Sequence, residues 1–352
     1  MVIGSRVPSC EANRLRDVGG IVLGIESTAH TFSIGWVDGL GVPGKSVSSF
    51  VRPIKGGIHP REAADHHAKN AGRILNELLE NDVQLSDVKA IAFSQGPGLG
   101  PCLRIGASVA RSLAVQLSVP LVGVNHCVAH IEVGRERCDC DDPVLLYASG
   151  GNTQVIARLD GKYRVLGETL DIGIGNMLDK FAREQGIPFP GGPKIESLAL
   201  EWLNENPEPR LEGLELPYAV QGMDLAFSGV LNAALNLVEK GVPLPAVCWS
   251  LQEHTFAACV EVAERAMAHA GKTELLLGGG VACNDRLRNM CDVMAQGRDS
   301  TSHVPEKFLC IDNGSMIATL GRLQLLWGSE TILGESGVRQ DLRTDETPIL
   351  WN

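Results

Sequence analysis

Ile21-Val22-Leu23-Gly24-Ile25 is an apolar run typical of a buried β-strand. The small and polar residues Glu26-Ser27-Thr28-Ala29-His30 follow, and a second strand is expected at Thr31–Val37. This stretch therefore predicts a strand, a tight turn and a returning strand. Backbone amides in such a turn can hold a phosphate, although an ordinary β-hairpin has the same pattern.

The same succession recurs about 120 residues later in the chain. Pro143-Val144-Leu145-Leu146-Tyr147 predicts a strand, Ala148-Ser149-Gly150-Gly151-Asn152 a turn, and Thr153–Leu159 a returning strand. This weak internal repetition predicts two lobes that begin with the same strand–turn–strand unit. We expect an N-terminal extension at 1–20, a first lobe at 21–142 that is completed by about 313–352, and a second lobe at 143–312.

The composition describes a folded protein with an acidic surface. With 352 residues, 44% of them hydrophobic and 21% charged, the chain is long enough for two packed lobes. The net charge of −11 argues against strong unaided binding to a nucleic-acid backbone. The ten cysteines include no C-x-x-C pair, and no apolar run reaches the roughly eighteen residues of a membrane span. We therefore expect a cytoplasmic protein.

Further elements alternate along the chain, as in an α/β fold. Helices are expected at 62–81, 103–117, 195–204, 228–239, 250–270, 285–296 and 315–327, and strands at 88–93, 121–124, 274–277 and 308–311. The glycine-rich loop 94–101 can bind an anion between a strand and a helix, but it lacks the lysine of a P-loop.

A histidine pair follows the strand at 121–124. Asn125 suits a helix N-cap, and His126 and His130 then lie on one helix face, where both rings can reach one metal ion. Two ordinary helix histidines have the same spacing. Cys127 stands where a zinc protease needs a glutamate base, which disfavours such a protease. Cys138-Asp139-Cys140 is either a metal clip or a solvated loop.

Asp312 follows the expected strand at 308–311 and precedes Asn313-Gly314. An acid at the tip of a strand is where α/β folds place metal or nucleotide ligands, and a helix N-cap is the alternative for this residue. Gly278-Gly279-Gly280 at the end of another strand leaves room for a flat ring against the backbone.

Taken together, these motifs resemble the universal tRNA N6-adenosine threonylcarbamoyltransferase family. Its archaeal and eukaryotic members are the catalytic subunit of the KEOPS complex, and its bacterial relatives are called TsaD. The resemblance covers about residues 21–351. The matching stretches are 24–31, 57–64, 94–101, 124–126 with His130, 149–155, 171–180, 190–193, 278–284, 312–314 and 343–346.

The resemblance implies the fold class of actin, sugar kinases and heat-shock ATPases, which is two-lobed α/β with nucleotide and metal in the interlobe cleft. It also implies the reaction. Threonylcarbamoyl would pass from threonylcarbamoyl-AMP to N6 of adenosine 37 in tRNAs that decode ANN codons, with release of AMP. Alternatives are a small-molecule kinase of the same fold and a nucleotide-gated scaffold or chaperone-like ATPase.

The resemblance also assigns roles to individual positions. His126, His130 and Asp312 would be catalytic and would bind one divalent metal, with Tyr147 as a fourth ligand. Substrate would contact Tyr147, Ala148, Ser149, Gly150, Gly151, Asp179, Gly192, Glu196 and Asn284. The metal would be iron, with zinc or magnesium as alternatives, and nitrogen–oxygen ligation suits iron or zinc best. Backbone amides of the 149–151 loop would stabilise an oxyanion, each by about 3 kcal/mol.

The implied partners are tRNA, threonylcarbamoyl-AMP and KEOPS-type subunits, namely a kinase-like ATPase, a dimerising subunit and a tRNA-binding subunit. No membrane is involved. The sequence leaves open which metal binds, the oligomeric state, the role of residues 1–20 and a fusion with the kinase partner. It departs from the family pattern at Ser27, Cys127, Val128 and Lys194. A thiol at Cys127 could alter metal preference.

Overall fold

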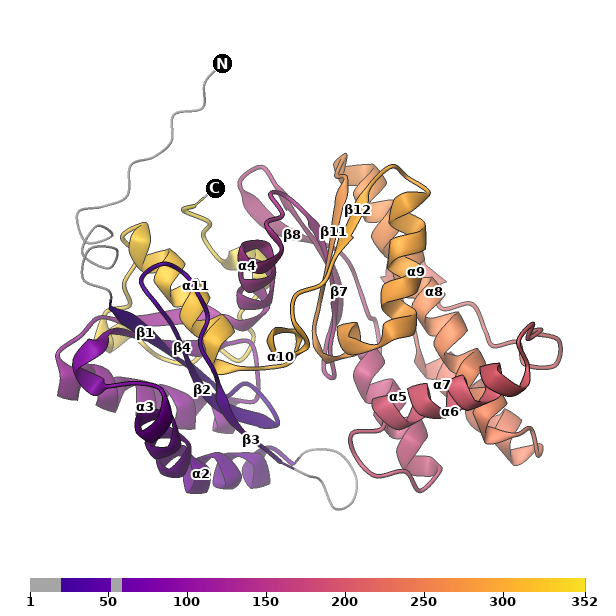
Figure 1. Cartoon of the computed structure of the whole chain (residues 1–352), viewed down its shortest axis with the longest axis horizontal. Helices are drawn as coiled ribbons and strands as arrows, with labels where there is room; N and C mark the ends of the chain where they lie inside the picture. Colours follow the sequence, from indigo (N-terminus) through magenta and orange to yellow (C-terminus); the bar gives the residue numbers. More distant parts are fainter. Residues whose placement is uncertain (1–19, 52–58, 352) are drawn as a thin grey trace. The chain divides into compact units, whose positions relative to one another are not determined.

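The computed structural model describes residues 20–51 and 59–351 (Figure 1). The chain forms two compact units: unit 1 is Met1–Glu136 with Asp312–Asn352, and unit 2 is Arg137–Ile311. The predictions for residues 1–19 and for the loop 52–58 lie outside the described residues. The division between the units falls after Glu136, within a helix, whereas the sequence had predicted it after residue 142. Asp312 belongs to unit 1, whereas the sequence had placed it in the second lobe.

Unit 1 is built on a five-stranded sheet with the order β3-β2-β1-β4-β5. Its central strand β1 pairs antiparallel with β2 and parallel with β4, and β5 pairs parallel with β4. The strands are β1 (Ile21–Glu26), β2 (Thr31–Val37), β3 (Val47–Phe50), β4 (Val88–Gly96) and β5 (Leu121–Asn125).

Helices cover both faces of this sheet, as the alternation of side chains along β1 requires. Leu23 and Ile25 pack in the core formed with α2 (Pro60–Asn81) and α3 (Gly100–Leu117). Gly24 points to the opposite face, toward α11 (Gly314–Leu326) (Figure 1). A Cβ on Gly24 would lie 2.1 Å from the carbonyl oxygen of Gly314, so only glycine permits this close approach.

Short-range signals determine where the helices of unit 1 begin. Pro60 occupies the first turn of α2, where its missing N–H leaves no hydrogen bond unmade. Asn125 ends β5, and its Oδ1 accepts from the backbone N–H groups of Cys127 and Val128 at 2.9 and 3.2 Å. The expected cap of α4 (His126–Cys138) is therefore confirmed.

Unit 2 repeats the sheet of unit 1 with the order β12-β11-β6-β7-β8. Its central strand β6 pairs antiparallel with β7 and parallel with β11, as β1 does with β2 and β4. The outer pairings also correspond, so the predicted internal repetition is confirmed. The strands are β6 (Val144–Ala148), β7 (Thr153–Leu159), β8 (Lys162–Glu168), β11 (Glu274–Gly278) and β12 (Thr301–His303).

The helices of unit 2 bury one face of this sheet, and Val144, Leu146 and Ala148 join their core. The long helix that ends at Ala270 is followed by Gly271, whose φ of 63° suits glycine. The helices are α5 (Ile174–Glu184), α6 (Gly192–Glu205), α7 (Ser228–Glu239), α8 (Leu244–Ala270) and α9 (Asp285–Gln296), and a small hairpin joins β9 (Val220–Gln221) to β10 (Asp224–Leu225).

The strand expected at 308–311 is wrong. This segment forms a short helix, α10 (Lys307–Cys310), in which the Glu306 carbonyl accepts from the N–H groups of Leu309 and Cys310 at 2.8 and 3.3 Å. Phe308 and Ile311 are exposed, so this apolar segment does not form a buried strand. Helical turns also occur at η1 (Leu85–Asp87), η2 (Gly280–Cys283), η3 (Leu333–Glu335) and η4 (Thr344–Glu346).

No helix among the described residues is both long enough and apolar enough to cross a lipid bilayer.

Candidate metal centre and substrate loops

Two histidines of α4 and one aspartate meet in unit 1. The rings of His126 and His130 have centroids 4.9 Å apart and are nearly perpendicular. Their Nε2 atoms lie 3.5 and 3.4 Å from the same atom, Oδ1 of Asp312. Both histidines are buried. One ligand atom from each of the three residues lies within 4.8 Å of the others, so the group can hold a metal ion.

The distances from Asp312 to the two rings are long for hydrogen bonds and leave room for a shared ion. A hydrogen bond between nitrogen and a carboxylate oxygen is usually about 2.7–3.2 Å long. Two ligand atoms that each lie about 2.1 Å from an ion are roughly 3.0 Å apart at an octahedral angle and roughly 3.4 Å apart at a tetrahedral angle. The separations from Asp312 to the two rings, 3.5 and 3.4 Å, are within reach of one bound ion.

Glu26, at the end of β1, orients the first histidine. Its Oε2 lies 2.9 Å from Nδ1 of His126, and its Oε1 accepts from both the backbone N–H and the hydroxyl of Thr28 at 2.6 Å. A carboxylate that accepts from Nδ1–H leaves the lone pair of Nε2 for a metal. Sequence reasoning missed Glu26 and Thr28. Glu26 is an acid at a strand tip, the same signal that singled out Asp312.

The charges of the group favour a cation. Burial lowers the pKa of His126, but the carboxylates of Glu26 and Asp312 outweigh it and raise that pKa to about 9. Burial lowers the pKa of His130. Burial alone would raise the pKa of Asp312, but His126 and His130 hold it below its ordinary range. The two carboxylates therefore favour a positive charge here, which a proton or a metal ion can supply.

Asp312 does not cap the helix that follows it. The cap of α11 is Asn313, whose Oδ1 accepts from the backbone N–H of Met316 at 2.9 Å. This excludes the helix-cap interpretation of Asp312. Its carboxylate is directed instead toward the histidines of α4.

The loop after β6, which holds the predicted substrate contacts at 148–151, is closely packed within unit 2. The carbonyl oxygens of Ser149 and Gly150 accept from the N–H groups of Gly175 and Asn176 at 3.0 and 3.1 Å, at the start of α5. A Cβ on Gly279 would lie 2.4 Å from the carbonyl oxygen of Ala148. Three glycine-containing loops, after β6, before α5 and after β11, thus meet in one place.

The other predicted substrate residues connect to these loops. Oδ1 of Asp179 accepts from the N–H of Gly191 at 2.7 Å, beside Gly192 at the start of α6. Oε1 of Glu196 accepts from the N–H of Asp285 at 2.8 Å. Asn284 caps α9 through Oδ1, and its Nδ2 donates to Gln252 at 2.7 Å. These carboxylates and amides therefore hold the loops in place.

Tyr147 lies near the end of β6 in unit 2, where it pairs with Gln154 of β7. The other three predicted metal ligands lie in unit 1. The role of Tyr147 at the metal stays a prediction.

Residues that depart from the family pattern are accommodated locally. Cys127 is buried beside His126. The backbone N–H of Ser27 donates to Oγ of Ser94 at 3.0 Å, and Lys194 lies 3.7 Å from Glu201. Among the residues that the structure describes, Cys138 and Cys140 belong to no group of metal-binding side chains.

Comparison with known proteins adds independent information. The family model described as tRNA N6-adenosine threonylcarbamoyltransferase, or TsaD, matches residues 45–319. A protein of that description from Thermococcus kodakarensis is 51% identical over 334 residues, which are 94% of this chain and 100% of that relative. A probable bifunctional tRNA threonylcarbamoyladenosine biosynthesis protein from Methanosarcina mazei is 50% identical over 94% of this chain but only 59% of its own length. The chain therefore spans about three fifths of the bifunctional relatives it matches.

Solved structures share the fold at low sequence identity. HypF from T. kodakarensis has a TM-score of 0.58 at 16% identity, covering 88% of this chain and 48% of that one. An activator of 2-hydroxyisocaproyl-CoA dehydratase from Clostridium difficile has a TM-score of 0.54 at 9% identity, covering 87% and 95%. The predicted fold class, the two-sheet α/β class of actin, sugar kinases and heat-shock ATPases, is confirmed.

Proposed function

Because the chain belongs to the tRNA N6-adenosine threonylcarbamoyltransferase family, we propose that it transfers threonylcarbamoyl from threonylcarbamoyl-AMP to N6 of adenosine 37 in ANN-decoding tRNAs. The new bond joins N6 to the carbamoyl carbon, the bond from that carbon to the phosphate oxygen breaks, AMP leaves, and N6 releases one proton to solvent. The observation that carries this proposal is the group of His126, His130 and Asp312, whose first histidine is oriented by Glu26.

We infer that His126, His130 and Asp312 hold one divalent metal ion. Two imidazoles and a carboxylate suit iron or zinc better than magnesium or calcium. When bound, the ion supplies Lewis-acid stabilisation of charge on the acyl or phosphate oxygens. The part of Glu26 is to accept from Nδ1–H of His126, which keeps Nε2 of that ring directed toward Asp312.

The 149–151 loop is the proposed site of oxyanion stabilisation, with one revision. The backbone N–H of Ser149 already donates to the Asn152 carbonyl at 2.9 Å, so it is engaged within the loop. The proposed donors are therefore the amides of Gly150 and Gly151. An amide aimed at a developing negative charge typically contributes about 3 kcal/mol to the transition state.

The adenylate would be held by the loops that Asp179, Gly192, Glu196 and Asn284 organise. Both polar atoms of Asn284 are engaged, one in capping α9 and one with Gln252. We propose that Asn284 acts by ordering the turn, so that the adenine ring rests against the glycines after β11. AMP is a good leaving group, so positioning of the amine accounts for most of the rate and no covalent enzyme intermediate is required.

Strong binding of tRNA is expected to require partner subunits. A chain with a net charge of −11 attracts cations and not the negatively charged phosphates of tRNA. The proposed partners are a kinase-like ATPase, a dimerising subunit and a tRNA-binding subunit. Nanomolar binding of tRNA by the chain alone at low salt would contradict this expectation.

The test of the proposed function is reconstitution. The purified chain, its partner subunits, threonylcarbamoyl-AMP and unmodified tRNA should yield the modified nucleoside by mass spectrometry, with equimolar AMP. Elemental analysis of the same preparation identifies the metal. Transfer of phosphate from ATP to a small acceptor would support the kinase alternative. Nucleotide binding without turnover that survives His126→Ala would support the scaffold alternative.

A further inference from the structure

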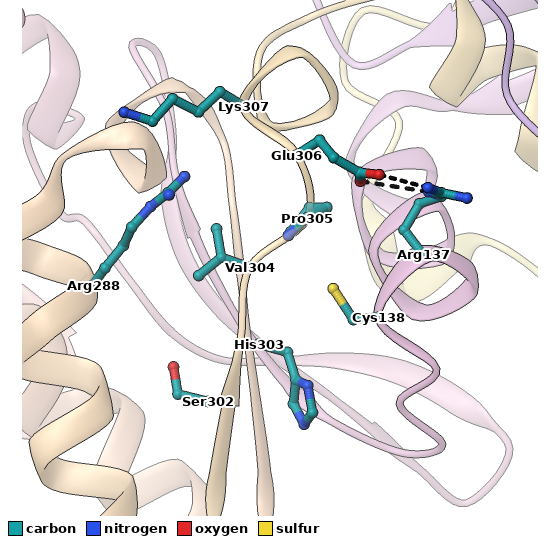
Figure 2. A pocket seen from close by; sticks show the side chains of 9 residues that line it. All are labelled: Arg137, Cys138, Arg288, Ser302, His303, Val304, Pro305, Glu306 and Lys307. Atoms are coloured by element: carbon teal, nitrogen blue, oxygen red, sulfur yellow. Dashed lines mark hydrogen bonds and ion pairs between the residues drawn. The ribbon is translucent and has the colours of Figure 1, made fainter.

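A cavity of about 640 Å³ lies within unit 2, apart from every residue assigned above to metal or substrate (Figure 2). Its lining comes from the end of α4, from α9, and from β12 with the segment that leads into α10. The lining residues are Arg137, Cys138, Arg288, Ser302, His303, Val304, Pro305, Glu306 and Lys307. Three of the nine carry a permanent positive charge and one a negative charge, so the lining is basic in an acidic protein.

The guanidinium of Arg288 has unused donor capacity at this cavity. Its Nε donates to the carbonyl oxygen of Ala282 at 2.6 Å, which fixes the direction of the side chain. Its Nη2 is buried, and it has no hydrogen-bond partner within residues 20–51 and 59–351. Nor is any carboxylate of those residues in ion-pairing distance of this guanidinium. A buried, unpaired charged donor is costly, and an anionic ligand would satisfy it.

A hydroxyl group on the same lining is also a buried, unsatisfied donor. Oγ of Ser302, on β12, is buried and also has no hydrogen-bond partner in the described part of the chain. Figure 2 shows Ser302 and Arg288 on the same side of the segment that carries Val304 and Pro305. The cavity thus has two donors, one of them charged, that no described protein group satisfies.

The one carboxylate of the lining does not compete for Arg288. Glu306 is held by the guanidinium of Arg137, as the dashed lines in Figure 2 show, and this bond lowers the pKa of Glu306. Lys307 is largely exposed at the cavity rim and pairs with Asp285 at 3.6 Å. After the pairs of Arg137 with Glu306 and of Lys307 with Asp285 are set aside, the positive charge of Arg288 remains.

We propose that this cavity binds a phosphate group, carried by a nucleotide or by an RNA backbone, through Arg288 and Ser302. The planar fork of a guanidinium matches two phosphate oxygens, and a hydroxyl can donate to a third. Lys307 adds a long-range attraction from the rim. This inference does not depend on the proposed transfer reaction, because it rests only on the lining of the cavity.

The first test measures binding of inorganic phosphate to the full chain by calorimetry at low salt. Arg288→Gln should weaken binding at least about tenfold, and Ser302→Ala about threefold. Ser302→Ala should leave the melting temperature unchanged or raise it, since it removes an unsatisfied hydroxyl. Arg164→Gln, which removes a charge from an exposed position of β8, is the control and should bind like the wild type. Equal phosphate affinity in all four proteins, or no saturable binding by the wild type, would overturn the proposal.

The second test locates the ligand and its source. Cys138 lines the cavity, so bound phosphate should slow alkylation of its thiol in the wild type but not in Arg288→Gln, as measured by peptide mass spectrometry. A short single-stranded RNA and AMP are then compared as competitors. Displacement of phosphate by the RNA identifies a backbone site, and displacement by AMP alone identifies a nucleotide site. Alkylation of Cys138 that phosphate does not slow would contradict the assignment to this cavity.

Discussion

Nδ1 of His126 lies 2.9 Å from Oε2 of Glu26, a residue 100 positions earlier in the chain. The two side chains meet because β1 and β5 both pair with β4 in parallel, which brings the ends of these strands to one edge of the sheet. Glu26 ends β1, and His126 begins the helix directly after β5. The orientation of a metal-binding imidazole thus depends on strand pairing.

Glu26→Gln should weaken metal binding by about 10- to 100-fold, the usual effect of losing such a partner. The amide oxygen can still accept from Thr28, but its NH₂ group would then donate to Nδ1 of His126. That bond stabilises the tautomer that carries hydrogen on Nε2, which cannot bind a metal. Competition with a chelator measures the affinity. Glu62→Gln, at an exposed position in the first turn of α2, is the control, and equal affinity in the two variants would contradict the role of Glu26.

His130→Ala should abolish metal retention and tRNA modification while the fold is kept. Removing one of three ligands leaves His126 and Asp312, which offer too few donor atoms for a stable site. Metal content and modified nucleoside are measured in parallel with circular dichroism. His269→Ala, in the exposed last turn of α8, should match the wild type. Full modification by the His130 variant would show that the ion is not held as inferred.

Gly24→Ala should destabilise unit 1 by about 3 kcal/mol, because the new methyl group would overlap the start of α11. Its Cβ would lie 2.1 Å from the Gly314 carbonyl oxygen and 2.3 Å from the Ala318 nitrogen, and both are backbone atoms. Gly72→Ala is the matched change: nothing lies within 4 Å of its Cβ, and alanine in α2 should stabilise by about 0.5–1 kcal/mol. Urea unfolding compares the two variants, and the free energy of unfolding should fall for Gly24→Ala and rise for Gly72→Ala.

His67, buried in α2, should make unit 1 less stable in acid. Burial, aided by the charge of His66, lowers its pKa from 6.5 to about 4. Nε2 lies 3.0 Å from the Ala29 carbonyl, which only accepts, so Nε2 donates and Nδ1 accepts from Nδ1 of His66 at 3.3 Å. The two neighbouring histidines therefore bond to each other.

The pKa of His67 is lower in the folded state than in the unfolded state. Its contribution to the free energy of unfolding is therefore fully present above pH 6.5 and is lost as the pH falls toward 4. The expected loss between pH 7 and pH 5 is roughly 2 kcal/mol. The charged or titratable neighbours are His66 and His30. Urea midpoints at the two pH values measure the effect, and His67→Gln should show a smaller difference. The same difference in both proteins would assign the acid sensitivity to other groups.

Sequence reasoning failed at two segments where it relied on composition alone. The run Phe308-Leu309-Cys310-Ile311 has the composition of a buried strand, yet Phe308 and Ile311 are exposed and the segment is helical. The amide of Ser149 was expected to stabilise an oxyanion, yet it is used within its own loop. Local composition predicts a conformational preference, and tertiary contacts decide whether that preference is realised.

By itself, the sequence determined the repeated strand–turn–strand units, the main helices and the cap at Asn125. These features depend on hydrophobic periodicity and on hydrogen bonds that span only a few residues. Only the tertiary structure decided that Glu26 orients His126, that Asn313 and not Asp312 caps α11, and that Asp312 faces both histidines. Parallel strand pairing and the packing of α11 on the sheet bring these residues together, and no local pattern encodes contacts between residues 100 or 182 positions apart.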